Sequence, residues 1–188
     1  MRRQSKHIRR KTGKRSQSTR AKSKFVPPRT LEEFFAMREL DQEIWRNVVQ
    51  AVTEMRAGAS RRQAALKFDL DPRKMLQRAP SALRKLRNGR WVAKPHDRLL
   101  RVLVIPTRKG LREIGVRDSR QASLLGKYWT AVDRYRDTGD ASALREFRGK
   151  YIIDTDGKQH RLLTDLRALD RLGSAGVLSF ETLYAKAA

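Results

Sequence analysis

Two helix-start signals, eleven residues apart, most constrain how this chain folds. Ser60 followed by Gln63 has the spacing of a capping box, and Asp71 followed by Pro72 places a good N-cap before a proline at the first helical position. Gly58, just before the first signal, can end a preceding helix because glycine adopts the left-handed conformation at little cost. This stretch is therefore predicted to hold two short helices joined by a tight turn, with a third helix in front of them.

Helical signals also lie on both sides of this stretch. Thr30 and Glu33 have capping-box spacing at the start of a short helix, and residues 41–57 carry apolar side chains three and four residues apart, which indicates a longer helix with one buried face. Pro80 is expected to kink or restart the helix that begins at Pro72. Residues 81–87 are then predicted to be helical again.

Beyond the turn at Asn88-Gly89 the apolar period changes from about 3.6 to 2. Hairpins are expected from 100–107 with 111–116 and from 151–153 with 160–163, and further helices are expected at 119–136, before Phe147, at 165–172 and at 179–185. The predicted fold class is α+β: a disordered basic arm over 1–29, a helical helix-turn-helix-like domain over 30–87, and a small mixed domain of β-hairpins and helices over 90–188.

The segment from Arg56 to Arg78 resembles the homeodomain-like helix-turn-helix of resolvases, invertases and transposase N-terminal regions. The resemblance covers residues 40–85 and rests on the glycine and polar cap before the second helix and the alanines inside it. It implies that the helix from Pro72 enters the major groove, where exposed side chains reach base edges, while the start of the second helix contacts phosphates. The residues implied as base readers are Arg73, Lys74, Gln77 and Arg78, and those implied as phosphate contacts are Arg61 and Arg62. The same pattern also fits a plain three-helix packing unit with a charged outer face.

The charge of the chain points to a polyanionic partner. The chain has 44 lysines and arginines against 20 acidic residues, a net charge of +24, which informs on partners rather than on fold. The first 30 residues hold twelve of these cations and no acid, with too few apolar side chains to form a core. They are expected to neutralise phosphates without reading sequence. The arm residues predicted to bind nucleic acid are Arg2, Arg3, Lys6, Arg9, Arg10, Lys11, Lys14, Arg15, Arg20, Lys22 and Lys24.

Catalytic and metal-binding patterns are weak. The chain has no cysteine, which excludes disulfides, thiolate catalysis and cysteine-ligated zinc and fits a reducing cytoplasm. The histidines His7, His96 and His160 lack a spacing suited to a shared metal, and residues 154–157 resemble the start of a calcium loop but lack its later ligands, so a turn is predicted there. No apolar run is long enough to span a bilayer. No cofactor, metal, membrane association or enzymatic activity is expected.

A second group of cations surrounds the helix predicted at 119–136. This helix carries Tyr128, Trp129 and Tyr135, and aromatic rings among cations can stack on unpaired bases. Aromatic residues at helical spacing more often belong to a core, which is the favoured interpretation of Trp129. The cations of this group are Arg117, Arg120, Lys127, Arg134 and Arg136.

These patterns favour a cytoplasmic DNA-binding protein, associated with the nucleoid, that regulates transcription or serves a mobile element or phage. The spread of positive charge beyond the arm favours an alternative, an RNA- or ribosome-associated structural protein. A further alternative is a phage packaging or assembly accessory, in which residues 90–188 bind a protein partner or self-associate.

Overall fold

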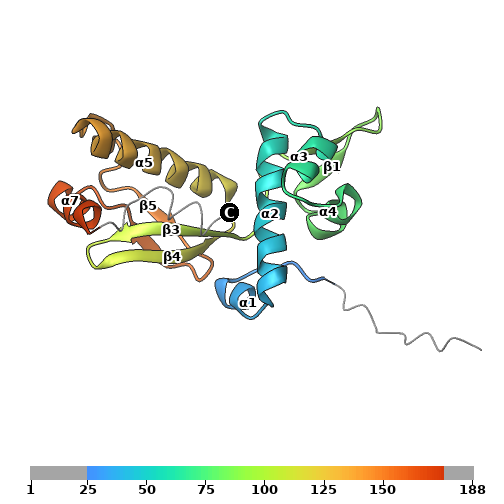
Figure 1. The fold of residues 1–188 in the computed structure, drawn as a ribbon, viewed down its shortest axis with the longest axis horizontal. Coiled ribbons are helices and arrows are strands. Elements are labelled where there is room, and N and C mark those ends of the chain that lie inside the picture. The colour runs from blue at the N-terminus through green and yellow to red at the C-terminus, as the bar shows by residue number, and fades with distance from the viewer. Residues whose placement is uncertain (1–24, 176–188) are drawn as a thin grey trace, which may run out of the picture.

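A computed structural model describes residues 25–175. Within this range seven helices and three two-stranded antiparallel hairpins form an α+β fold, as predicted (Figure 1). Residues 1–24, which include most of the predicted arm, and the helix expected at 179–185 lie outside the described residues. None of the described helices is long and apolar enough to cross a membrane.

The first half of the fold is built around one long helix. The helices are α1 (Leu31–Phe35), α2 (Glu39–Arg56), α3 (Arg61–Lys67) and α4 (Pro72–Arg78), close to the predicted ranges. The side chain of Thr30 caps α1 by accepting a hydrogen bond from Glu33 N, as its spacing predicts. Helix α2 buries Trp45, Val48 and Val52, each at most 1% exposed, in a core that also holds the buried residues of α3 and α4.

The prediction of a helix over residues 81–87 is wrong. Strand β1 (Leu83–Lys85) pairs antiparallel with β2 (Trp91–Ala93) around the Asn88-Gly89 turn. Helix α4 stops before Pro80, and Gly89 adopts the positive φ of +80° that a tight hairpin needs. Cross-strand pairing and burial of Leu83 therefore override the local helical spacing.

The second half alternates hairpins and helices. In chain order it contains β3 (Arg101–Thr107), β4 (Gly110–Val116), α5 (Ser119–Thr138), α6 (Ser142–Arg145), β5 (Tyr151–Ile153), β6 (Gln159–Arg161) and α7 (Leu166–Ser174). Both predicted hairpins and the long helix are confirmed. Helix α5 lies along the β3–β4 hairpin, with Leu125 and Tyr128 buried in the shared core (Figure 1).

The chain has two separate cores that meet at a short link. The first core extends past the helices to include the β1–β2 hairpin and ends at Leu99 and Leu100, and the second begins at Ile105. The indole Nε1 of Trp45 donates to the carbonyl oxygen of Leu100 at 3.0 Å. Helix α2 is thereby hydrogen-bonded to the segment that leads into β3.

A buried carboxylate in the link joins α2 to β3. The Asp97 side chain is fully buried and forms ion pairs with Arg56 of α2 and with Arg101 of β3, the latter at 2.9 Å. Its other oxygen accepts a hydrogen bond from Leu99 N at 2.8 Å. Burial lowers the pKa of Arg101 to about 10 and also lowers the pKa of Arg56. The two halves are therefore held together by polar contacts that water does not reach freely.

Candidate nucleic-acid interface

The turn between α3 and α4 has the hydrogen bonds of a Schellman motif. Leu70 N donates to Ala65 O at 2.9 Å, and Asp69 N donates to Leu66 O at 3.2 Å. Asp69 occupies the left-handed position, with φ of +52°, where glycine is the usual residue. The buried Leu70 then directs the chain into the next helix start. This turn sets the angle at which α4 leaves α3.

Both predicted caps are present. Ser60 and Gln63 form the full capping box at α3, with hydrogen bonds of 3.1 and 3.2 Å. At α4 the Asp71 carboxylate accepts from Arg73 N at 2.7 Å. This hydrogen bond, reinforced by the neighbouring cations, lowers the pKa of Asp71 below its usual range. The carboxylate is thus ionised at neutral pH and holds the first turn of α4 in place.

Helix α4 has one buried and one exposed face. Met75 is completely buried against α2 and α3, whereas Arg73, Lys74 and Gln77 are exposed. The three exposed side chains form no hydrogen bond or ion pair with any residue in the 25–175 range. The structure therefore places three of the four predicted base readers on one short outward face.

Arg78, the fourth predicted reader, has a different environment. Its guanidinium lies 5.0 Å from the centre of the Phe25 ring, and the Phe25 ring in turn stacks on Trp45 with centroids 6.2 Å apart. The side chain is half-buried. Arg78 thus holds Phe25, the first described residue, next to the C-terminal end of α4.

The two cations predicted to contact phosphate open α3. Arg61 is half-buried and Arg62 is exposed, and they occupy the first and second positions of the helix. Backbone N–H groups and the positive end of a helix favour anions at this position.

Sequence reasoning missed the basic β1–β2 hairpin. Four exposed cations, Arg84, Lys85, Arg87 and Arg90, lie on its strands and tip. The Asn-Gly turn next to Trp91 and Val92 is a hairpin signal that would have identified it.

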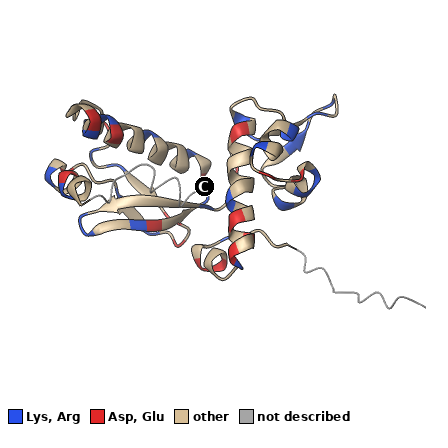
Figure 2. Cartoon of the chain, in the orientation of Figure 1, with Lys and Arg blue, Asp and Glu red and all other residues tan. Residues whose placement is uncertain are grey.

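Positive charge is concentrated on α3, α4 and this hairpin. Residues 60–94 contain eleven lysines and arginines and only two acidic residues, Asp69 and Asp71. Helix α2, which supports them, has four acidic residues and two arginines. In Figure 2 the ribbon of α3, α4 and the hairpin, which lie on one side of α2, carries blue segments that mark lysine and arginine. We call this surface, defined by Arg61, Arg62, Arg73, Lys74, Gln77, Arg84, Lys85, Arg87 and Arg90, the basic face.

The eleven arm residues predicted to bind nucleic acid, from Arg2 to Lys24, lie outside the described residues. The aromatic residues of α5 are described, and all three use their polar atoms inside the fold. Tyr128 donates to Leu163 O at 2.7 Å, Trp129 donates to Val104 O at 2.9 Å, and Tyr135 donates to Asp170 at 2.8 Å. Burial also raises the pKa of Tyr128. These contacts support the prediction that Trp129 is part of the core rather than a base-stacking platform.

The predicted turn at residues 154–157 is confirmed. Asp154 accepts hydrogen bonds from Asp156 N and Lys158 N and is 2.6 Å from the ring of His160. Among residues 25–175 no group of three or more histidine or acidic side chains is placed to hold a metal ion.

Comparison of the chain with models of protein families, with curated protein sequences and with solved structures finds no match in any of the three.

Proposed function

We propose that this protein binds double-stranded DNA, with α4 in the major groove and the β1–β2 hairpin on the flanking backbone. The outward face of α4 carries the proposal: Arg73, Lys74 and Gln77 are exposed, lack partners in the described fold, and project from a helix fixed by a cap and a Schellman turn. Arginine pairs with guanine and glutamine with adenine through two hydrogen bonds each. A rigid short helix with these side chains is suited to reading bases.

The cations around α4 supply affinity without sequence choice. The basic hairpin follows α4 directly in the chain and packs on α2. Phe25, which contacts Arg78 of α4, comes directly after the segment 1–24 with its eleven cations in the sequence. Each phosphate that such a cation neutralises releases counterions. Binding is therefore expected to combine a small sequence-reading element with a large electrostatic one, in a transcriptional regulator or a mobile-element or phage accessory.

Selection from a random pool of double-stranded DNA by the full chain tests the proposal. We expect an enriched motif, and we expect the double substitution Arg73→Ala with Gln77→Ala to reduce discrimination between this motif and scrambled DNA by about 1–3 kcal/mol per lost base contact. The pair Arg148→Ala with Gln159→Ala, exposed positions in the second half, is the matched control and should leave discrimination unchanged. Failure to enrich any motif, or equal loss on all sequences after the α4 substitutions, would contradict base reading.

The same experiment separates DNA from RNA. An RNA pool offered in competition should be bound with the weak, salt-sensitive affinity of non-specific contacts. Preferential recovery of folded RNA would instead favour the RNA-associated alternative, which the positive charge of the second half continues to support.

A further inference from the structure

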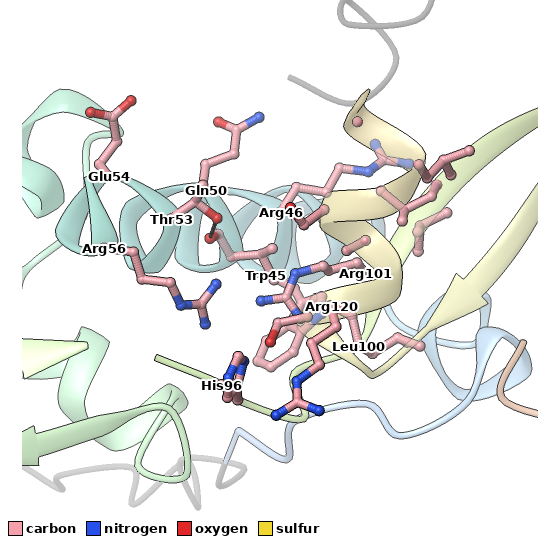
Figure 3. Close-up of a pocket in the computed structure, with 18 of the residues that line it drawn as sticks. Trp45, Arg46, Gln50, Thr53, Glu54, Arg56, His96, Leu100, Arg101 and Arg120 are labelled. Carbon is pink, nitrogen blue, oxygen red and sulfur yellow. Dashed lines mark hydrogen bonds between the residues drawn. The ribbon is translucent and has the colours of Figure 1, made fainter. Parts of the chain in front are cut away.

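A cleft of about 940 Å³ lies between the two halves of the fold, away from the basic face. Helix α2 forms one wall, and β3, the link and the first turns of α5 form the other (Figure 3). The Trp45–Leu100 hydrogen bond and the ion pairs of Asp97 fix these walls relative to each other. The cleft is therefore part of the folded structure, and its volume is in the range of small-molecule sites.

The lining of the cleft is mostly apolar. It includes Val49, Phe68, Leu103 and the rings of Trp45 and Trp129. Both indole N–H groups are already bonded to backbone carbonyls, of Leu100 and Val104, so the rings have no free donor to offer a ligand. The cleft therefore suits an apolar body.

The charged side chains of the cleft are almost all positive. Five cations line it, Arg46, Arg56, Lys67, Arg101 and Arg120, against one acidic residue, Glu54, which is paired with Lys67. Figure 3 shows Arg101 of β3 and Arg120 of α5 on the same side of the cleft as Trp45, whereas Arg46 of α2 points away from Arg120. The Arg46 guanidinium lies 5.3 Å from the centre of the Phe34 ring. Arg120 is exposed and has no side-chain hydrogen bond or ion pair with the part of the chain that the structure describes.

The end of the cleft at Arg120 is the most positive. A smaller polar cleft of about 450 Å³ adjoins it there and adds Arg98 and Arg117. The acidic residues at this end are already committed: Asp97 pairs with Arg56 and Arg101, and Asp118 caps α5 by accepting from Arg120 N at 2.8 Å. An incoming anionic group would therefore find cations in excess.

We propose that this cleft binds a small amphipathic organic anion, with its apolar body against Trp45, Val49 and Trp129 and its carboxylate or similar group at Arg120. An inorganic anion alone would leave the apolar walls in contact with water, and an apolar cation would face an excess of like charge. The site is independent of the basic face, because no residue of that face lines the cleft.

Titration of the nucleic-acid-free full chain with decanoate, decanol and decyltrimethylammonium tests the proposal. Two of the three tryptophans line the cleft, so saturable binding should change intrinsic fluorescence. We expect decanoate to bind at least about tenfold more tightly than the cation of equal chain length. Acetate and inorganic phosphate, which carry charge without an apolar body, should not compete.

Gly126→Leu provides a blocking variant that keeps the fold. Gly126 lines the cleft from α5, a Cβ added there meets no atom within 4 Å, and leucine is a better helix former than glycine. This variant should bind decanoate at least about tenfold more weakly. The matched control is Gly173→Leu, a helical glycine of α7 outside the cleft with equal free space, which should bind as the wild type does.

The variant Arg120→Gln separates the contribution of charge to ligand binding from that of apolar contact. It should weaken decanoate binding while leaving decanol binding unchanged, whereas Lys127→Gln, an exposed cation of α5 that does not line the cleft, should affect neither.

No saturable decanoate binding, equal binding of the three decyl compounds, or full binding by Gly126→Leu would overturn the proposal. Binding that appears only after removal of residues 176–188 would also overturn it, because that result would make the chain's own C-terminal segment the occupant of the cleft.

Discussion

Arg56 at the end of α2 and Asp97 in the link form an ion pair across 41 residues of sequence, and the Asp97 side chain is completely buried. Arg101 completes the group from β3, so one carboxylate neutralises two partly or fully buried guanidinium groups. Together with the Trp45–Leu100 hydrogen bond, this one acidic side chain sets the relative position of the two halves.

Replacing that side chain should destabilise the fold strongly. In Asp97→Ala both arginines lose their counter-charge while they remain desolvated, and removal of one partner from a buried ion pair costs about 3–5 kcal/mol. The free energy of unfolding from urea denaturation measures the loss. Glu146→Gln, an exposed acidic position without a described partner, is the control and should change stability by less than about 0.5 kcal/mol. A loss of similar size in both variants would argue against the proposed role of the ion pairs.

At the left-handed turn residue between α3 and α4, a substitution is expected to stabilise the fold rather than destabilise it. Asp69 has φ of +52°, and glycine adopts this conformation without a steric penalty. Asp69→Gly is expected to stabilise the fold by up to about 1 kcal/mol, and Asp69→Val to destabilise it by about 1–2 kcal/mol. Thermal unfolding of the two variants checks the order. Equal unfolding temperatures would show that this backbone conformation carries no strain.

The β1–β2 hairpin should contribute affinity rather than sequence choice. Replacing Arg84, Lys85, Arg87 and Arg90 with alanine is expected to weaken binding to all DNA sequences alike and to reduce the slope of log K against log salt by about 0.9 for each lost phosphate contact. Fluorescence anisotropy at several salt concentrations gives both quantities. Four alanines at other exposed cations, Arg145, Arg148, Lys158 and Arg161 of the second half, form the control and should leave the slope unchanged. A change in the preferred motif after the hairpin substitutions would mean that the hairpin reads bases.

The β5–β6 turn should add a pH-dependent contribution to stability. Burial acts to raise the pKa of Asp154, but the hydrogen bonds from His160, Lys158 N and Asp156 N outweigh it and lower the pKa below its unfolded value. The stabilisation is therefore present above the unfolded pKa and is lost as the pH falls through the folded one. The difference in unfolding free energy between the wild type and Asp154→Asn should be largest near neutral pH and shrink in acid. A difference that stays constant between about pH 6 and pH 2 would contradict this linkage.

Local signals account for most of the fold. The caps at Thr30, Ser60 and Asp71 and the period-2 strands act within a few residues, so their effects can be predicted without knowing the tertiary structure. The strand at Leu83–Lys85 was missed because its partner, Trp91–Ala93, decides its conformation. The apolar spacing of residues 81–87 does favour a helix, but the pairing of β1 with β2 stabilises the strand more.

In the candidate sites, too, some features follow from local sequence signals and others depend on tertiary contacts. The exposed face of α4 follows from helical periodicity once its start is known, so the exposure of Arg73, Lys74 and Gln77 could be predicted from the sequence. The contact of Arg78 with Phe25 and the ion pair of Asp97 with Arg56 join residues 53 and 41 positions apart. Such contacts depend on how the helices pack, and no sequence spacing reports them. The cleft likewise exists only because the two cores meet at an angle that leaves α2 and α5 apart.

The Phe25 ring contacts both Trp45 and Arg78, and under the proposed function this arrangement affects the affinity for DNA. It holds Phe25, the residue that directly follows the cation-rich sequence 1–24, beside α4. If α4 and this sequence both bind DNA, as proposed, engagement of one places the other at a high effective concentration. Under the proposed function the two elements behave as a bivalent ligand. A short helix that binds weakly by itself then gains avidity from the arm, and Phe25→Ala should lower overall affinity without removing any side chain from the DNA interface.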